Sequence, residues 1–281
     1  MSDASDPRGI PAVPADADDA ELVHAVERNT AEMLLRMGDA GGGVRRDDDV
    51  TWTMGGSPLD YHNAVVAAQL RSDTADGVIL ESRDRLAAAG LSGSWHVGPS
   101  MRPKDLRARL ERAGFVSDGE EPGMVASLGG HRPGDDRVRP PSDVTIEIVR
   151  DTARLDEWTH ALGSGFGEGP REAAWVGEMF RRIGLDHPDW HHLLARRDDR
   201  VVGTATVLVA SGVGGLFFVM TVPDARRQGI GAAITRAAML VARDAGMHHA
   251  VLTSSTAGRA LYESVGFRQV CTIRLHTWRP L

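Results

Sequence analysis

The sequence has one cysteine, one lysine and few aromatic residues. Cys271 is the single cysteine among 281 residues, which excludes an internal disulfide framework and fits a reducing compartment. Lys104 is the single lysine, so arginine carries nearly all of the positive charge. The formal net charge of −7 argues against nucleic-acid backbones and anionic membrane surfaces as partners.

Two further absences concern targeting and membranes. Residues 1–6 carry neither the basic nor the apolar part of a secretory signal, and no apolar run approaches the length of a membrane-spanning helix. We therefore expect a cytoplasmic protein with no membrane partner. Hydrophobic residues make up 42% of the chain and charged residues 25%, which is typical of a soluble globular protein.

Composition also predicts how the chain is divided. Residues 1–19 are rich in Asp, Ala and Pro and are predicted to be disordered. Residues 129–143 have the Gly and Pro content of a linker. We therefore expect one domain over residues 20–128 and a second over residues 144–281.

The most informative stretch of the second domain reads as a strand, a turn and a helix. Residues 216–222 are apolar and β-branched, as in a buried strand, and Pro223 ends it because proline cannot donate to a sheet ladder. Gly229 and Gly231 then allow close backbone approach. Apolar residues recur at helical spacing over residues 232–245.

This arrangement predicts a phosphate site, with an ordinary strand-to-helix turn as the alternative. Backbone N–H groups at a helix N-terminus favour anions, and Arg226 and Arg227 add positive charge beside them. A Walker loop would need Gly-Lys-Ser/Thr, which is absent. A Rossmann fingerprint would need a third glycine where Ile234 stands.

Two segments resemble the GNAT N-acetyltransferases over roughly residues 143–281. The first is similar to the acetyl-CoA-binding motif of that family, Arg/Gln-x-x-Gly-x-Gly/Ala after a Val-x-Pro strand end. It is filled here by Val222, Pro223, Arg226, Gly229 and Gly231. The second, residues 255–267, resembles the last helix of the family, in which Tyr262 precedes a Gly-Phe stop.

The resemblance implies a fold and a co-substrate. The fold is α/β (α+β), with tandem GNAT-like domains that are each a mixed, mostly antiparallel twisted sheet flanked by helices. The implied co-substrate is acetyl-CoA, and no metal is expected. The cofactor-binding residues implied by the motif positions are Met220, Thr221, Val222, Arg226, Arg227, Gln228, Gly229, Ile230, Gly231, Ala232 and Ser255.

The resemblance also implies a catalytic residue. Tyr262 would act as the general acid that protonates the departing thiolate, while a backbone N–H of residues 220–222 would polarise the thioester carbonyl. A purely packing role for this tyrosine is the alternative. We expect the acid to contribute at the low end of the usual range, because a thiolate of pKa about 8.5 leaves fairly well unaided.

The acceptor site and the general base are less determined. In this family the helices expected here over residues 152–162 and 171–183 form the acceptor wall, which makes Glu168, Glu172 and Trp175 candidate substrate contacts; a solvated acidic face is the alternative. The strands over 201–210 and 216–222 carry no carboxylate. A base acting through water, Glu168 or Glu172 as the base, and proximity alone all stay open.

Three histidines invite a metal interpretation that we set aside. His187, His191 and His192 lie at or near the start of a predicted alternating strand without a repeated ligand spacing, in a chain with one cysteine.

The first domain is interpreted as a degenerate repeat of the second. Residues 106–115 align without a gap over residues 258–267, with five identities, and chance similarity of two helices is the alternative. Leu110 occupies the place of Tyr262. Where the phosphate loop should be, residues 71–77 contain one glycine and two aspartates, which would repel a pyrophosphate.

The resemblance therefore implies a degenerate GNAT-like N-terminal half without a CoA motif. It would stabilise the fold or shape the acceptor site. The aromatic and polar residues that would line such a site, or pack in the core, are Trp52, Tyr61, His62, Asn63 and Trp95.

The expected function is direct transfer of an acetyl or other acyl group from acetyl-CoA to a primary amine of a small molecule in a ternary complex. A non-catalytic acyl-CoA-binding or scaffold protein is the alternative. The acceptor, the acyl-chain preference and the oligomeric state are left open, with a homodimer as one arrangement that the sequence allows.

Overall fold

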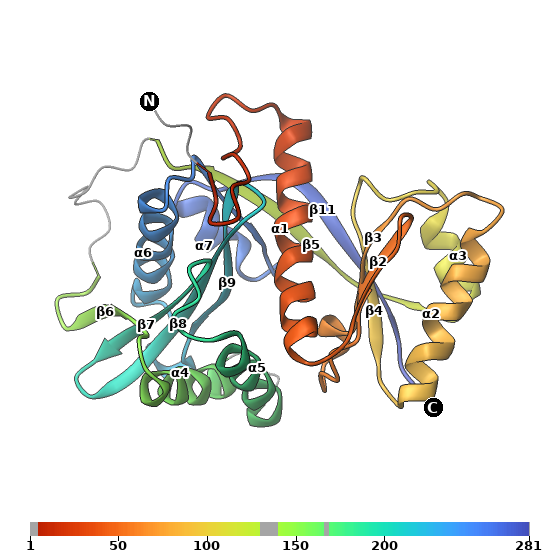
Figure 1. The fold of residues 1–281 in the computed structure, drawn as a ribbon. Coiled ribbons are helices and arrows are strands. Elements are labelled where there is room, and N and C mark those ends of the chain that lie inside the picture. The colour runs from red at the N-terminus through yellow and green to blue at the C-terminus, as the bar shows by residue number, and fades with distance from the viewer. Residues whose placement is uncertain (1–4, 130–139, 166–168, 281) are drawn as a thin grey trace.

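The computed structural model describes residues 5–129, 140–165 and 169–280. In these residues one continuous eleven-stranded twisted sheet runs through both halves of the chain, in the order β1-β2-β3-β4-β11-β5-β10-β9-β8-β7-β6 (Figure 1). Most neighbours are antiparallel, and two pairs, β3–β4 and β9–β10, are parallel. The fold class is thus the mixed α/β arrangement predicted from the sequence.

The N-terminal half supplies three helices and five strands. They are α1 (Asp19–Ala40), β1 (Val44–Arg46), β2 (Val50–Thr53), the 3-10 turn η1 (Asp60–His62), β3 (Ala64–Ala68), α2 (Ala75–Ala89), β4 (Gly93–Val97), α3 (Leu106–Arg112) and β5 (Val116–Ser127).

The C-terminal half supplies the remaining elements. They are β6 (Val144–Ile148), α4 (Thr152–Gly165), α5 (Pro170–Ile183), β7 (Trp190–Arg197), β8 (Arg200–Ala210), β9 (Val213–Thr221), the 3-10 turn η3 (Pro223–Ala225), α6 (Ile230–Asp244), β10 (His249–Thr253), α7 (Arg259–Ser264) and β11 (Arg268–Trp278).

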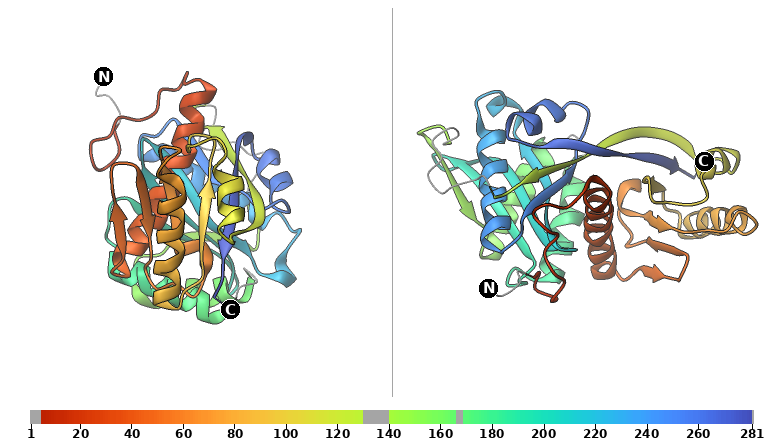
Figure 2. Two further views of the ribbon diagram at one scale, coloured as in Figure 1. Left: turned by 90° about the vertical axis from the view of Figure 1, so that its right-hand side faces the viewer. Right: turned by 90° about the horizontal axis from the view of Figure 1, so that it is seen from above.

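Each half gives one long strand to the other. β5 lies between β10 and β11, with Val125 opposite Val251. β11 lies between β4 and β5, with His276 opposite Trp95. Figure 2 shows these two strands bridging the bodies of the molecule. The boundary expected between residues 128 and 144 therefore separates the elements in sequence but does not separate the sheet.

The internal repeat expected from the sequence is present in the order of the elements. The series β3-α2-β4-α3-β5 has the same order as β9-α6-β10-α7-β11, including one parallel strand pair in each. Gly114 follows α3 with φ 91° and Gly266 follows α7 with φ 100°, a left-handed conformation that favours glycine. Leu110 and Tyr262 occupy the same helical position and are both buried.

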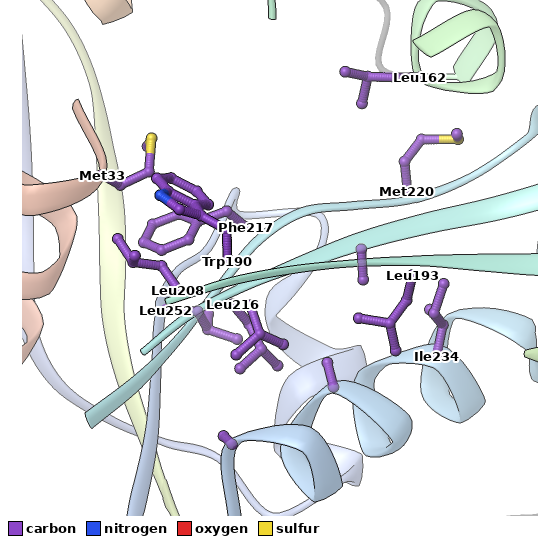
Figure 3. Packing of buried hydrophobic residues seen from close by; sticks show 14 of the residues in the cluster. Met33, Leu162, Trp190, Leu193, Leu208, Leu216, Phe217, Met220, Ile234 and Leu252 are labelled. Atoms are coloured by element: carbon purple, nitrogen blue, oxygen red, sulfur yellow. The ribbon is translucent and has the colours of Figure 1, made fainter. Parts of the chain in front are cut away.

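The hydrophobic core crosses the boundary between the halves. Met33, Leu34 and Met37 of α1 belong to the same buried cluster as the C-terminal sheet, and Figure 3 shows Met33 beside Phe217 and Trp190. Asn29 of α1 donates to the carbonyls of Leu208 (3.3 Å) and Ala210 (2.8 Å) at the end of β8. Helix α1 therefore packs against the C-terminal half as a structural part of it.

The chain before α1 corrects the expectation of a disordered N-terminus. Residues 1–4 lie outside the described residues, but residues 5–18 follow a defined path. Val13 donates to Gly212 O (2.9 Å), and Asp6, 3% exposed, accepts N–H groups of its own turn. Asp18 forms a capping box with Glu21 at the start of α1. Side-chain hydrogen bonding to backbone groups thus orders a segment that composition alone marks as disordered.

Two other expectations concern the linker and membrane-spanning helices. Residues 130–139 of the expected linker 129–143 lie outside the described residues. In the part of the chain that the structure describes, no helix is both long and apolar enough to cross a membrane.

Candidate active site

The loop between β9 and α6 presents a row of backbone donors. After η3 the chain turns through Arg227 (φ 60°) and Gly229 (φ 81°), both left-handed, and α6 begins at Ile230. None of the backbone N–H groups of residues 227–232 has an acceptor within the described part of the chain. These donors lie at the positive end of the α6 dipole, so the loop has the geometry of a nest that favours anions.

The two glycines of the loop are needed for different reasons. A side chain at Gly229 would meet no atom within 4 Å, so this residue is required for its positive φ. A Cβ at Gly231 would lie 3.2 Å from Leu261 Cδ2 and 3.4 Å from Thr221 Oγ1. Gly231 is therefore required for the close approach of α6 to α7 and to the end of β9.

The three polar side chains of the loop that are predicted to hold the cofactor differ in how far they are already engaged. Arg226 donates to Thr221 O (3.0 Å) and to Gly165 O (2.7 Å), so it fastens the loop to β9 and to α4. Gln228 Oε1 accepts a hydrogen bond from Arg197 (2.8 Å). The exposed Arg227 has no ion pair or hydrogen bond to a side chain of the described residues. It is the arginine that can reach a bound anion.

Strands β9 and β10 separate before they reach the loop that precedes α6. Their parallel pairing is confined to Gly214 and Gly215 of β9, opposite Ala250 and Val251, while β9 continues to Thr221 along β8 alone. Beyond Gly215, β9 therefore has an edge that pairs with no described strand. Backbone groups along this edge are available to an extended ligand that carries amides.

A bulge lies in the free part of β9. Phe218 has φ 51°, and the register with β8 shifts between Thr204 and Thr206, so Thr204 Oγ1 donates to Phe218 O (2.8 Å). Val222 N–H already donates to Val202 O (3.1 Å), which removes one of the predicted backbone donors. Met220 turns its side chain toward α4, as Figure 3 shows, so only its backbone remains for a ligand.

Tyr262 lies on α7 with its ring buried and its hydroxyl uncommitted. The side chain is 9% exposed and packs edge-on against Phe267 at 5.9 Å between ring centroids. Burial raises its pKa to about 12, so the hydroxyl is protonated at neutral pH. The hydroxyl oxygen is not one of the fully enclosed polar atoms without a hydrogen bond. It therefore keeps some exposure to solvent. Ser255 lies in the exposed turn before α7, where its Oγ accepts the N–H of Gly258 (3.2 Å).

The corresponding region of the N-terminal half is closed. Beyond the parallel pair Val65–Trp95, the edge of β3 is taken by Arg102, whose N–H donates to Ala68 O (3.0 Å) and whose carbonyl accepts from Leu70 (3.2 Å). The free strand edge of the C-terminal half thus has no counterpart here.

The loop before α2 is also unlike the nest before α6. The N–H groups of Thr74 and Ala75 both donate to Arg71 O, and the Arg71 guanidinium is paired with Asp73 (2.6 Å). The donors and the cation of this loop are thus already occupied within the protein, whereas those of the C-terminal loop are not.

Side chains from both halves meet near the bulge in β9. His62 of η1 stacks on Trp175 of α5 with ring centroids 5.0 Å apart and an interplanar angle of 22°, and it lies 6.4 Å from the Phe218 ring. Tyr61 donates its hydroxyl to Glu121 Oε2 (3.1 Å). We call Tyr61, His62, Glu121, Trp175 and Phe218 the interface cluster.

Glu121 is the member that sequence reasoning missed. It lies on β5, and Thr253, at the end of β10, also hydrogen-bonds to its carboxylate; burial raises the pKa of that carboxylate above its usual range. The sequence analysis considered strand carboxylates of the C-terminal half alone. Glu121 lies on β5, which comes from the N-terminal half and joins the C-terminal strands. The sequence contains no local signal for that exchange.

Of the two glutamates predicted from the sequence, the structure describes Glu172, which points away from the interface cluster. Glu172 stands in the first turn of α5 and folds back toward Gly169, where its Oε2 would lie 3.1 Å from an added Cβ. A carboxylate in this position stabilises the helix N-terminus. Glu168 lies outside the described residues.

Three other residues that the sequence analysis named for the N-terminal half have structural roles. Trp95 donates to Ser82 (3.1 Å) in the N-terminal core, Trp52 lies under Arg45 and Arg85, and Asn63 donates to three loop carbonyls.

His192 is a core histidine. Its Nδ1 pairs with Thr206 Oγ1 (2.9 Å) and its ring lies 4.1 Å from that of Phe180. Burial lowers its pKa to about 3, so the ring is neutral. No group of three or more His, Cys, Asp or Glu residues in the described chain is placed to hold a metal ion.

Comparison with known proteins agrees with this geometry. Residues 188–269 match the family model described as "Acetyltransferase (GNAT) domain"; this segment contains the loop, the free edge of β9 and Tyr262. The chain matches none of the curated proteins.

Solved structures extend the likeness to the whole chain. A GCN5-related N-acetyltransferase from Kribbella flavida superposes with a TM-score of 0.66 at 18% identity, covering 90% of this chain and 95% of that one. One from Sphaerobacter thermophilus gives 0.62 at 17% identity, with 94% and 95% covered. A tandem GNAT protein from the clavulanic acid biosynthesis pathway gives 0.58 at 13% identity, with 83% and 80% covered.

The free strand edge and nest of one half, the closed counterpart of the other, and these likenesses lead to one assignment. Residues 188–269 match a GNAT acetyltransferase domain, and the chain as a whole has the fold of GCN5-related N-acetyltransferase structures, one of them a tandem GNAT protein.

Proposed function

We propose that this protein transfers an acyl group, in the first instance acetyl, from acyl-CoA to a primary amine of a small molecule. The observation that carries the proposal is the row of uncommitted N–H groups at residues 227–232, directly beside the free edge of β9. A pyrophosphate fits the first feature and a pantetheine chain with two amides fits the second. Gly229, Ile230, Gly231 and Ala232 contribute backbone donors, and Arg227 contributes charge.

The residues around the bulge supply the chemistry. As the amine nitrogen forms its bond to the thioester carbon and the carbon–sulfur bond breaks, a backbone N–H near the bulge stabilises the oxyanion. Tyr262 protonates the sulfur, which leaves free thiol. A phenol whose pKa is raised to about 12 is a weak acid for a thiolate, so its contribution is expected at roughly 10–100-fold.

The test is release of free thiol from acetyl-CoA in the presence of a panel of primary amines. Amine-dependent release that exceeds hydrolysis in buffer supports transfer. Acetyl-CoA binding in a molar ratio of one, without amine-dependent release, would instead identify a binding protein. Loss of both binding and release would contradict the proposal.

A further inference from the structure

On the basis of the proposed acyl-CoA site, we propose that the acceptor is a small monocationic amine with a flat apolar body and no carboxylate. The geometry assigns its binding site to the interface cluster, so the N-terminal half supplies part of it. Glu121 receives the ammonium group.

The position of the cluster supports this assignment. Phe218 forms the bulge of β9, and Thr253 ends β10, so both mark the place where the two strands have separated. Tyr61, Glu121, Trp175, Phe218 and Thr253 are all partly exposed. An acceptor in contact with them would lie beside the gap between β9 and β10.

The charge of the cluster selects a cation. Glu121 is held by two neutral hydroxyl groups, those of Tyr61 and Thr253, and no charged group is among the causes of its raised pKa. Among the described residues, its carboxylate contacts hydroxyl groups and forms no ion pair. A second carboxylate, such as that of an amino-acid acceptor, would meet like charge without compensation.

The rings of the cluster favour a flat body. His62 is neutral because burial, with a smaller contribution from His96, lowers its pKa to about 3, so it does not repel an ammonium group. Trp175 and Tyr61 are partly exposed aromatic rings, and rings of this kind attract a cation or stack with a planar group. An apolar ring is thus better accommodated than a branched polar chain.

The proton balance assigns a second role to Glu121. An alkylammonium must lose one proton before its nitrogen can attack, and the carboxylate of Glu121 accepts that proton. When the carbon–nitrogen bond forms and the carbon–sulfur bond breaks, the sulfur gains the proton of Tyr262, and the second proton lost by the nitrogen restores the Tyr262 hydroxyl. The net reaction releases one proton and free thiol.

The experiment uses the full chain saturated with CoA. Calorimetry measures binding of 2-phenylethylamine and of phenylalanine, which has the same body with an added carboxylate. We expect phenylalanine to bind at least about tenfold more weakly. Glu121→Gln should weaken 2-phenylethylamine by a similar factor. Glu120→Gln is the matched control, because Glu120 is an exposed neighbour paired with Arg274 (2.7 Å), and it should change nothing.

Thiol release in parallel samples with acetyl-CoA separates this inference from the proposed function. Amine binding that depends on Glu121 but gives no thiol release supports the site and contradicts transfer. Equal use of both amines, or wild-type binding by Glu121→Gln, overturns the site even where transfer occurs. Absence of 2-phenylethylamine binding at millimolar concentration overturns it as well.

Discussion

At the scale of single residues, the two halves differ in whether corresponding polar side chains already have a partner within the protein. Tyr262 has a hydroxyl without a partner in the described structure, where the N-terminal half has Leu110. Arg227 is unpaired within the described residues, whereas Arg71 is held by Asp73. A group that is already satisfied inside the protein cannot bind a ligand without losing that interaction, so these differences favour ligand binding by the C-terminal half.

The role of Tyr262 is tested by two substitutions. Tyr262→Phe removes the proton donor and keeps the ring against Phe267, so kcat should fall roughly 10–100-fold while CoA affinity barely changes. Tyr262→Ala should in addition lower the free energy of unfolding by about 3–5 kcal/mol through the cavity it leaves. Steady-state kinetics and thermal melts measure both effects. Wild-type kcat in the Phe variant, with chemistry rate-limiting, would assign Tyr262 to packing alone.

At the scale of elements, the exchanged strands and α1 are the features that local sequence does not encode. Periodicity identifies β5 and β11 as strands but carries no information about which neighbour each one pairs with. The strand-turn-helix before α6 was predictable because glycine, proline and arginine stand at fixed offsets there. The interface cluster was not predictable, because Glu121 joins it only through the exchange of β5. Residues 5–18 were misjudged because Asp6 and Asp18 hydrogen-bond to backbone that composition cannot reveal.

The contact of α1 with β8 has a measurable cost when it is broken. Asn29 is fully buried and donates to the carbonyls of Leu208 and Ala210. Asn29→Ala should therefore lower the free energy of unfolding by about 1–3 kcal/mol. The exposed neighbour Arg28, changed to Ala, serves as the control and should leave it unaltered. Denaturant melts of the two variants make the comparison, and equal stability would show that α1 is not anchored there.

At the scale of the whole molecule, the shared sheet makes the halves interdependent. A C-terminal fragment starting at residue 140 lacks β5, so β10 and β11 lose the strand between them, and it also lacks α1. We expect this fragment alone to be insoluble or unfolded, and co-expression with residues 1–129 to restore a soluble one-to-one complex. Circular dichroism and native mass measurement decide this. A folded, monomeric C-terminal fragment would show that the strand exchange is dispensable.

Buried neutral histidines predict acid lability of the whole fold. Burial lowers the pKa of His62 and His192 to about 3 and that of His96 to about 4, from about 6.5 when unfolded. Below pH 6.5 the unfolded chain binds protons that the folded chain does not. The free energy of unfolding should then fall by up to about 1.4 kcal/mol per pH unit for each histidine, until pH nears the folded values.

Denaturant titrations between pH 7 and pH 4 measure this slope. His192→Asn should reduce it by about one proton, whatever its effect on stability at pH 7. An unchanged slope in the variant would mean that His192 does not contribute to the acid lability.

The central claim is that the C-terminal half alone binds acyl-CoA, through the nest before α6. Calorimetric titration of acetyl-CoA into the wild type and three variants tests it most directly. Gly229→Asp and Gly229→Asn impose the same backbone strain at φ 81°, but only the first adds a charge. Gly77→Asp adds a charge at the corresponding helix of the N-terminal half, where a side chain meets open space. We predict a molar ratio of one, binding by Gly229→Asp about 100-fold weaker than by Gly229→Asn, and wild-type affinity for Gly77→Asp. Two sites per chain, or equal affinities of the two Gly229 variants, would contradict it.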